Sequence, residues 1–207
     1  HFHLPPVKNH QPDVCTFCPL FSVRSSDLQF SLFMPALLKP DCEIADPITR
    51  ILSDVDGVMT DGRIVYDNQC VETKRFHVRD GVAIKAWMKS GFGFGILTAR
   101  TSDIVSHRAA ELGIENVQQG YEDKWPAAEG MMLAMGCEPE QVCYIGDDLP
   151  DIAVMRRVGL AVAPADAAFD AQEAAGWILR SKGGEGALRE LIERLLRSKH
   201  RWEEHLS

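Results

Sequence analysis

The stretch "ILSDVDGVMTDG", residues 51–62, decides the fold of this chain. Three apolar or small residues run directly into two aspartates, Asp54 and Asp56, and Gly57 follows at once. A short apolar run of this kind is typical of a buried strand. Because carboxylates are unfavourable in a buried place unless they have partners there, we interpret Asp54 and Asp56 as groups placed for chemistry.

The bulk properties narrow the class of protein. The chain has 207 residues, of which 45% are hydrophobic and 25% charged, so we expect one globular domain with a real core. The net charge of −8 argues against nucleic-acid or anionic-membrane binding, because both need a basic face. This net charge does not exclude an anionic substrate that binds in a locally positive pocket. No apolar run approaches the roughly 20 residues that a membrane-spanning helix requires.

The first 45 residues differ from the rest of the chain. They are rich in Pro, His and Ser, and they lack the basic start and apolar core of a secretory signal. We expect residues 1–45 to be poorly ordered or not native, with a native start near Met34, and residues 46–207 to form the folded domain. The cysteines are scattered, and the C-x-x-C pair at Cys15 and Cys18 has no partners to complete a zinc set. The scattered cysteines indicate a protein of the reducing cytoplasm.

From residue 48 onward, apolar runs alternate with amphipathic patterns. The apolar runs predict strands at 48–55, 92–97, 114–117, 142–145 and 160–163. The amphipathic patterns predict helices at 81–90, 102–112, 125–135, 150–158 and 167–175, and a terminal helix at 186–205. The alternation predicts an α/β fold, a Rossmann-like parallel sheet with helices on both faces.

One segment breaks this alternation. "RIVYDNQCVETKRFHV", residues 63–78, alternates with period two on both sides of the pair Asp67-Asn68, which tolerates positive φ. This pattern predicts a β-hairpin at the carboxyl edge of the sheet. An isolated hairpin is marginal in water, so we expect an interface that covers its apolar side chains, Ile64, Tyr66 and Val71. The alternative is a hairpin that folds back on its own domain.

The carboxyl edge of the predicted sheet collects polar side chains. In an open parallel sheet, ligands bind outside the carboxyl ends of the strands. Four segments deliver side chains to that edge: Asp54 and Asp56; Thr98 and Arg100; Lys124; and Asp147, Asp148 and Asp151. A calcium loop does not fit, because Gly57 follows the first aspartate too early for the glycine of such a loop. A phospho-receiver module does not fit either. In that class the acidic pair comes first and the Lys last, whereas here the acidic cluster at Asp147 follows Lys124.

Phosphate-ester hydrolysis through an aspartyl-phosphate fits every one of these positions. One carboxylate can attack phosphorus if a metal ion screens its repulsion from the phosphate oxygens. We expect Mg²⁺, because this ion is commonly held by only a few carboxylates. A second carboxylate two residues on can serve as acid and then as base. Thr98 can donate a hydrogen bond, and Lys124 can neutralise the phosphoryl oxygens.

At these residues the sequence resembles the haloacid dehalogenase superfamily. "DVDGVMTDG", Thr98, Lys124 and "GDDLPD" are similar to its four motifs, in the same order. The hairpin is the only insert, which resembles the capless branch. The resemblance implies Asp54 as nucleophile and Asp56 as acid/base, and Mg²⁺ on Asp54, the Asp56 carbonyl and Asp147.

Within that branch, "VRDG", "GDDLPD" and "GGEGALRE" resemble the phosphatases of 3-deoxy-D-manno-octulosonate 8-phosphate and of nonulosonate 9-phosphates. This resemblance implies a keto-sugar-acid phosphate as substrate, contacts from Arg79 and Arg100, and a homotetramer whose hairpins reach neighbouring sites. Two positions depart from the pattern: Ala99 replaces the usual Gly, and Glu185 replaces an Arg common in octulosonate phosphatases. The alternatives are a nonulosonate phosphatase and a catalytically silent oligomeric protein on the same fold.

Overall fold

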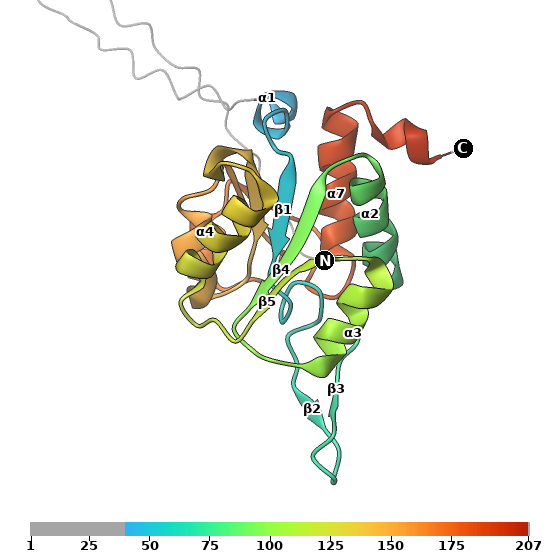
Figure 1. Ribbon diagram of the computed structural model, residues 1–207, viewed down its shortest axis with the longest axis vertical. Helices are drawn as coiled ribbons and strands as arrows, with labels where there is room; N and C mark the ends of the chain where they lie inside the picture. The colour runs from blue at the N-terminus through green and yellow to red at the C-terminus, as the bar shows by residue number, and fades with distance from the viewer. Residues whose placement is uncertain (1–39, 207) are drawn as a thin grey trace, which may run out of the picture. The chain divides into compact units, whose positions relative to one another are not determined.

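The computed structural model describes residues 40–206, and within them the predicted parallel sheet is present (Figure 1). Its six strands have the order β5-β4-β1-β6-β7-β8, and every neighbouring pair is parallel. The strands are β1 (Arg50–Ser53), β4 (Gly93–Thr98), β5 (Asn116–Gln119), β6 (Val142–Ile145), β7 (Leu160–Ala163) and β8 (Trp177–Ile178). The strand that carries Asp54 therefore lies in the middle of the sheet.

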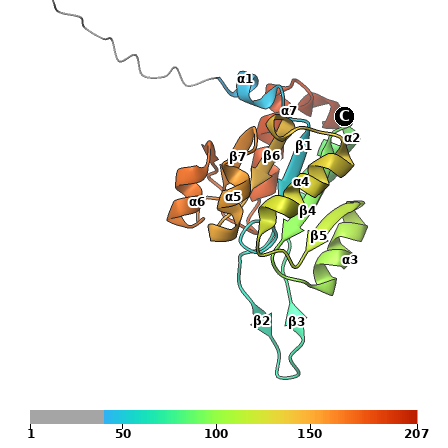
Figure 2. The same ribbon diagram turned by 60° about the vertical axis from the view of Figure 1, so that its left-hand side comes forward.

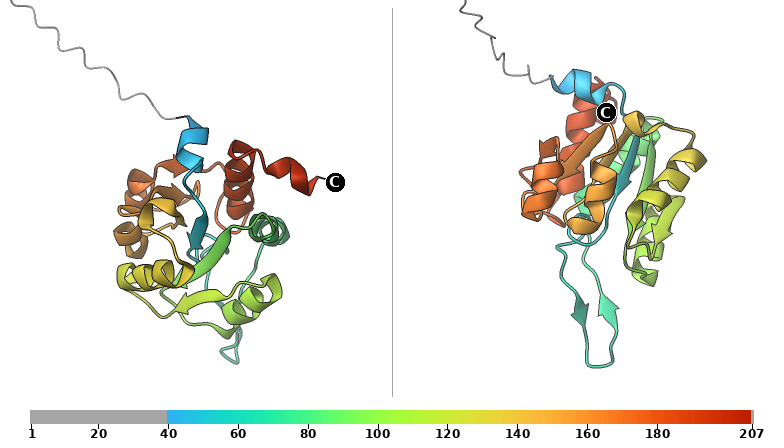
Figure 3. Two further views of the ribbon diagram at one scale, coloured as in Figure 1. Left: turned by 45° about the horizontal axis from the view of Figure 1, so that its top comes forward. Right: turned by 90° about the vertical axis from the view of Figure 1, so that its left-hand side faces the viewer.

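Helices cover both faces of the sheet, as predicted (Figure 3). One face carries α2 (Val78–Lys89), α3 (Asp103–Leu112) and α7 (Ala187–Ser198). The other carries α4 (Lys124–Met135), α5 (Ile152–Met155) and α6 (Phe169–Ala174). On β1, Ile51 belongs to the first core and Leu52 to the second, and both are fully buried. Two buried faces explain why this strand is a continuous apolar run and not an alternating one.

Several predicted elements have different limits in the structure. The helix expected at 150–158 is a 3₁₀ turn, η2 (Leu149–Asp151), followed by the short α5. The terminal helix expected at 186–205 ends at Ser198, and a second 3₁₀ turn, η3 (Trp202–His205), follows His200, whose φ is 55°. The strand β8 was not predicted, because two residues carry no periodicity. A third 3₁₀ turn, η1 (Pro139–Gln141), precedes β6.

The folded domain begins earlier than predicted. The helix α1 (Asp41–Ala45) falls in the segment that was expected to be poorly ordered. It is held by two hydrogen bonds of 2.6 and 2.7 Å from Arg194 on α7 to the Asp41 carboxylate. The remainder of that segment lies outside the described residues. Among residues 40–206, every helix is too short or too polar to cross a membrane.

The predicted hairpin is confirmed, and it extends away from the carboxyl edge of the sheet (Figure 2). Its strands β2 (Val65–Tyr66) and β3 (Glu72–Thr73) are antiparallel and pair for only two residues each. The turn is longer than the expected two residues. The Asp67 carboxylate accepts hydrogen bonds from the main-chain N–H groups of Gln69 and Val71, at 2.8 and 2.9 Å, and positive φ falls on Cys70 instead of Asn68.

Candidate active site

Asp54 lies directly beyond β1, in line with the strand. Its main-chain N–H donates to the Ile145 carbonyl at 3.0 Å, which extends the pairing with β6 by one residue. Its side chain is buried, with 6% of the residue exposed. Gly57 then turns the chain with φ of 93°, and a Cβ at this position would lie 1.9 Å from Asp147 Oδ2. The glycine in "DVDG" therefore lets the loop after β1 approach the loop after β6.

The predicted side chains meet in a crevice of about 290 Å³ at this edge of the sheet. Every residue predicted for catalysis or metal binding lines it, together with Arg100: Asp54, Asp56, Thr98, Arg100, Lys124 and Asp147. They come from the ends of β1, β4 and β6 and from the start of α4. The parallel sheet thus places in one crevice residues that are up to 93 positions apart in the sequence (147 − 54).

Lys124 is the cation in the floor of the crevice. It is the first residue of α4 and is 2% exposed. Its Nζ lies 2.9 Å from Asp54 Oδ1 and 2.6 Å from Asp151 Oδ1. Burial opposes its charged form, but the two carboxylates outweigh burial and raise the pKa of Lys124 above its usual value. The lysine is therefore a fixed positive charge beside Asp54.

Asp151 holds this arrangement together. Its Oδ1 accepts hydrogen bonds of 2.6 Å from Lys124 and from the Tyr144 hydroxyl. Its Oδ2 accepts from the main-chain N–H groups of Asp147 and Asp148 at 2.9 and 3.2 Å. Sequence reasoning placed Asp151 in the acidic cluster but gave it no role. The four-residue spacing between Asp147 and Asp151 could have indicated this role, because an Asp side chain can accept hydrogen bonds from main-chain N–H groups three and four residues before it.

The acidic cluster fits a hard divalent cation. One carboxylate oxygen from each of Asp54, Asp147 and Asp151 lies within 4.8 Å of the others. The oxygens of Asp151 are already engaged by four donors, whereas the contact recorded for Asp54 Oδ1 among the described residues is the single ion pair with Lys124. Burial raises the pKa of both Asp54 and Asp147, and mutual repulsion adds to the rise at Asp147. Two carboxylates that are poorly stabilised without a cation are suitable ligands for Mg²⁺, which prefers oxygen donors.

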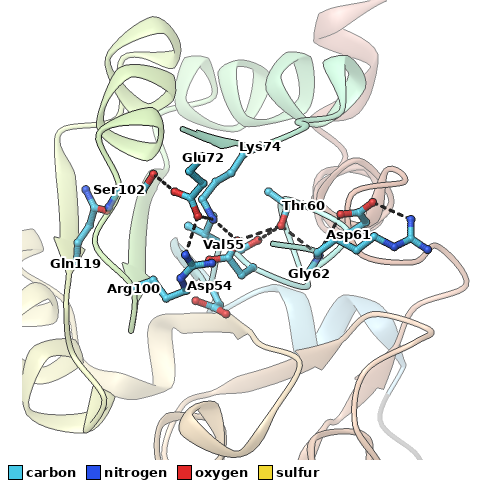
Figure 4. Close-up of polar contacts among 12 residues, drawn as sticks. Asp54, Val55, Thr60, Asp61, Gly62, Glu72, Lys74, Arg100, Ser102 and Gln119 are labelled. Atoms are coloured by element: carbon cyan, nitrogen blue, oxygen red, sulfur yellow. Dashed lines mark hydrogen bonds and ion pairs between the residues drawn. The ribbon is translucent and has the colours of Figure 1, made fainter. Parts of the chain in front are cut away.

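A second polar network lies over the other side of the crevice (Figure 4). Lys74, which follows β3, forms an ion pair with Asp56, and Arg100 donates to Glu72 at 2.7 Å. Lys74 is thus brought into the site by the hairpin of its own chain. The sequence does not predict this role for Lys74, because a charged residue in a hairpin of alternating pattern is expected to face solvent.

Arg79, predicted to contact substrate, is not in this crevice. It is an exposed residue in the first turn of α2 and lines a separate cavity of about 580 Å³. Glu185, which departs from the common pattern, lines the same separate cavity, together with His77 and Arg189. Neither Arg79 nor Glu185 therefore faces the crevice of its own chain.

Comparison with known proteins places this geometry in a family. The family model for haloacid dehalogenase-like hydrolases matches residues 118–191. The chain is 44% identical over 149 residues to the 3-deoxy-D-manno-octulosonate 8-phosphate phosphatase of Yersinia pestis, covering 72% of this chain and 80% of that protein. The chain belongs to the haloacid dehalogenase-like hydrolases. The predicted fold and the predicted family are confirmed.

Solved structures of this hydrolase family agree with the fold described above. The crystal structure of the Yersinia pestis phosphatase has a TM-score of 0.77 at 42% identity, over 78% of this chain and 88% of that one. The phosphatase of Moraxella catarrhalis, solved with a magnesium ion, a phosphate ion and a 3-deoxy-D-manno-octulosonate molecule, has a TM-score of 0.78 at 35% identity. That match covers 80% of this chain and 95% of the other.

Proposed function

We propose that this hydrolase is a Mg²⁺-dependent phosphatase that hydrolyses 3-deoxy-D-manno-octulosonate 8-phosphate to the free sugar acid and phosphate. The observation that carries the proposal is the buried Asp54 carboxylate, whose Oδ1 is paired with the Lys124 ammonium group at 2.9 Å. A carboxylate held in this way can attack phosphorus, and the adjacent ammonium group balances the charge that gathers on the phosphoryl oxygens.

The proposed reaction has two displacements at phosphorus. First, an oxygen of Asp54 bonds to phosphorus, the ester P–O bond breaks, and Asp56 gives its proton to the leaving sugar oxygen. Second, Asp56 takes a proton from water, the water oxygen bonds to phosphorus, and the bond to Asp54 breaks. Thr98, which is 2% exposed at the end of β4, and Lys124 hold the phosphoryl oxygens in both displacements.

Mg²⁺ would be held by the carboxylates of Asp54 and Asp147 and by the main-chain carbonyl of Asp56. When bound, it supplies positive charge that lets a carboxylate and a phosphate dianion approach each other. Asp151 is left out of this ligand set, because its two oxygens already accept four hydrogen bonds.

The substrate class is supported by charge and by similarity. Arg100 lines the crevice, and its Nη1 is buried without a hydrogen-bond partner among the described residues, so it can bind an anionic or hydroxylated part of the substrate. The relatives compared above are phosphatases of the octulosonate ester. A nonulosonate 9-phosphate remains the alternative substrate, since Glu185 stands where octulosonate phosphatases commonly have Arg.

We further propose that the protein is a cytoplasmic homotetramer in which each hairpin lies against a neighbouring subunit. Ile64, Tyr66 and Val71 on the hairpin are 52%, 57% and 53% exposed in the single chain. Exposed apolar side chains on a projecting element favour cover by another subunit. Arg79 and Glu185 would then face the site of a neighbour and not their own.

A panel of phosphate esters tests the function. Release of phosphate is measured with Mg²⁺ from 3-deoxy-D-manno-octulosonate 8-phosphate, a nonulosonate 9-phosphate and glucose 6-phosphate. The proposal predicts the highest kcat/KM for the octulosonate ester. A higher value for the nonulosonate ester would assign the alternative substrate, and equal values for all three would remove keto-sugar acids as the substrate class.

A further inference from the structure

Lys74 brings a buried positive charge from the hairpin to Asp56. The side chain of Lys74 is 2% exposed, although the residue follows directly after β3, in the return arm of a projecting hairpin. Its ammonium group pairs with Asp56 Oδ1, and the Thr60 hydroxyl lies 3.3 Å from the same oxygen. For the other oxygen, Oδ2, the one polar contact recorded among residues 40–206 is with the guanidinium of Arg100, 4.0 Å away. The carboxylate is thus anchored through Oδ1, and Oδ2 is left available.

A second set of contacts fixes Lys74 itself (Figure 4). Glu72 Oε1 lies 3.6 Å from Lys74 Nζ and accepts a hydrogen bond of 2.7 Å from Arg100. Glu72 Oε2 accepts from the Ser102 hydroxyl at 3.0 Å. Burial opposes the charge on Glu72, but the bond from Ser102 and the two cations outweigh it and lower its pKa. Glu72 is therefore a fixed negative charge that joins the hairpin to the loop after β4.

Attachment of the hairpin does not require Lys74 to reach Asp56. Glu72, Arg100 and Ser102 already join the hairpin to the rest of the domain. A buried lysine carries a desolvation cost that a surface lysine avoids, so its pairing with Asp56 calls for a separate reason. The alternation of a strand explains how it gets there, because Glu72 and Lys74 are two residues apart and share the face toward the crevice.

From these contacts we propose that Lys74 is a positioning residue for proton transfer by Asp56. It holds Oδ1 in place, so that Oδ2 faces the oxygen that leaves phosphorus and then the attacking water. Lys74 itself gives and takes no proton. The proton passes from Asp56 to the leaving oxygen in the first displacement and returns from water in the second. This inference rests on the proposed aspartyl-phosphate chemistry.

Two aryl esters separate positioning from simple structural support. Phenyl phosphate and 4-nitrophenyl phosphate have the same ring, but phenolate needs protonation to leave and 4-nitrophenolate needs little. With Mg²⁺, Lys74→Met should lower kcat/KM for phenyl phosphate about 10-fold or more beyond its effect on 4-nitrophenyl phosphate, since general acid catalysis is worth roughly 10²–10⁴-fold. Lys74→Arg, which retains the charge, should recover most of the loss.

Each remaining outcome has one meaning. An equal fall for the two esters in Lys74→Met would show that Lys74 only supports the fold, and it would overturn the inference. Where Lys74→Met does not fold, Lys74→Gln gives the same comparison. Arg63→Met is the matched control, because Arg63 is an exposed hairpin residue whose one ion pair among the described residues is with Asp61, and it should leave both rates unchanged. If the unmodified protein hydrolyses neither ester, the proposed function fails before the inference is reached.

Discussion

Asp54 combines a buried position with an ion pair of 2.9 Å to Lys124. Asp54→Asn keeps the volume of the side chain but removes its ability to attack phosphorus. Turnover of any phosphate ester should fall by at least about 10³-fold, as expected for loss of a nucleophile. The melting temperature without metal should not fall, because the substitution removes a charge that burial disfavours. Phosphate release and calorimetry check the two parts, and a folded, active Asp54→Asn protein would exclude Asp54 as nucleophile.

The raised pKa values of Asp54 and Asp147 make a prediction about pH. Both groups bind protons more tightly in the folded than in the unfolded state, where the ordinary value is 3.8. Their contribution to stability is therefore full below that value and is lost as pH rises through the raised folded pKa. Without metal, the melting temperature of the unmodified protein should fall over this window relative to that of Asp147→Asn.

Added Mg²⁺ should reverse that difference, because the ion binds the ionised carboxylates of the folded protein. Calorimetry at a series of pH values, with and without Mg²⁺, gives the comparison. If the unmodified protein and Asp147→Asn show the same pH dependence in both conditions, Asp147 has no raised pKa and is not a metal ligand.

The sequence predicts the location of those site residues that lie at the end of a strand or directly after it. Asp54, Thr98 and Asp147 could be placed together because the carboxyl ends of parallel strands share one edge. Lys74 could not be placed, since its position depends on how the hairpin bends over the crevice. The role of Asp151 depends on four hydrogen bonds that only the folded chain defines.

At the scale of elements, the hairpin pairs through only two residues in each strand. Ile64 and Val71 on it are 52% and 53% exposed, so another subunit is the proposed cover. Ile64→Asp combined with Val71→Asp should lower the molar mass measured by light scattering toward that of smaller assemblies. Leu133→Asp is the control, because Leu133 is 85% exposed on α4 and should leave the mass unchanged. A monomeric unmodified protein with full activity would rule out the tetramer.

Element limits were predicted less well than element order. The strand expected at 114–117 is β5 (Asn116–Gln119), because its register is set by pairing of Gly95 with Asn116 through Thr98 with Gln119. Gly159, the residue after the helix pattern at 150–158, is required by a close tertiary contact. A Cβ there would lie 2.1 Å from the Glu140 carbonyl oxygen. Tertiary contacts of this kind leave no periodic signal in the sequence.

At the scale of the whole molecule, the fold brings distant segments to one edge of the sheet and leaves the proposed chemistry to a few side chains. The central strand β1 is buried on both faces, so the loop that carries Asp54 and Asp56 starts from a rigid support. The hairpin places Lys74 beside Asp56, and the start of α4 places Lys124 beside Asp54. A cation bound by Asp54 and Asp147 would offset the negative charge that these two carboxylates carry when they are ionised.

The dependence of octulosonate 8-phosphate hydrolysis on Mg²⁺ tests this account most directly. Phosphate release is measured from the chelated protein as Mg²⁺ is titrated back, with Ca²⁺ in a parallel series. The account predicts no measurable release after chelation, full recovery with Mg²⁺, and inhibition by Ca²⁺, whose larger and more flexible coordination misplaces Asp54. Undiminished release from the chelated protein, or none after Mg²⁺ is restored, would contradict it.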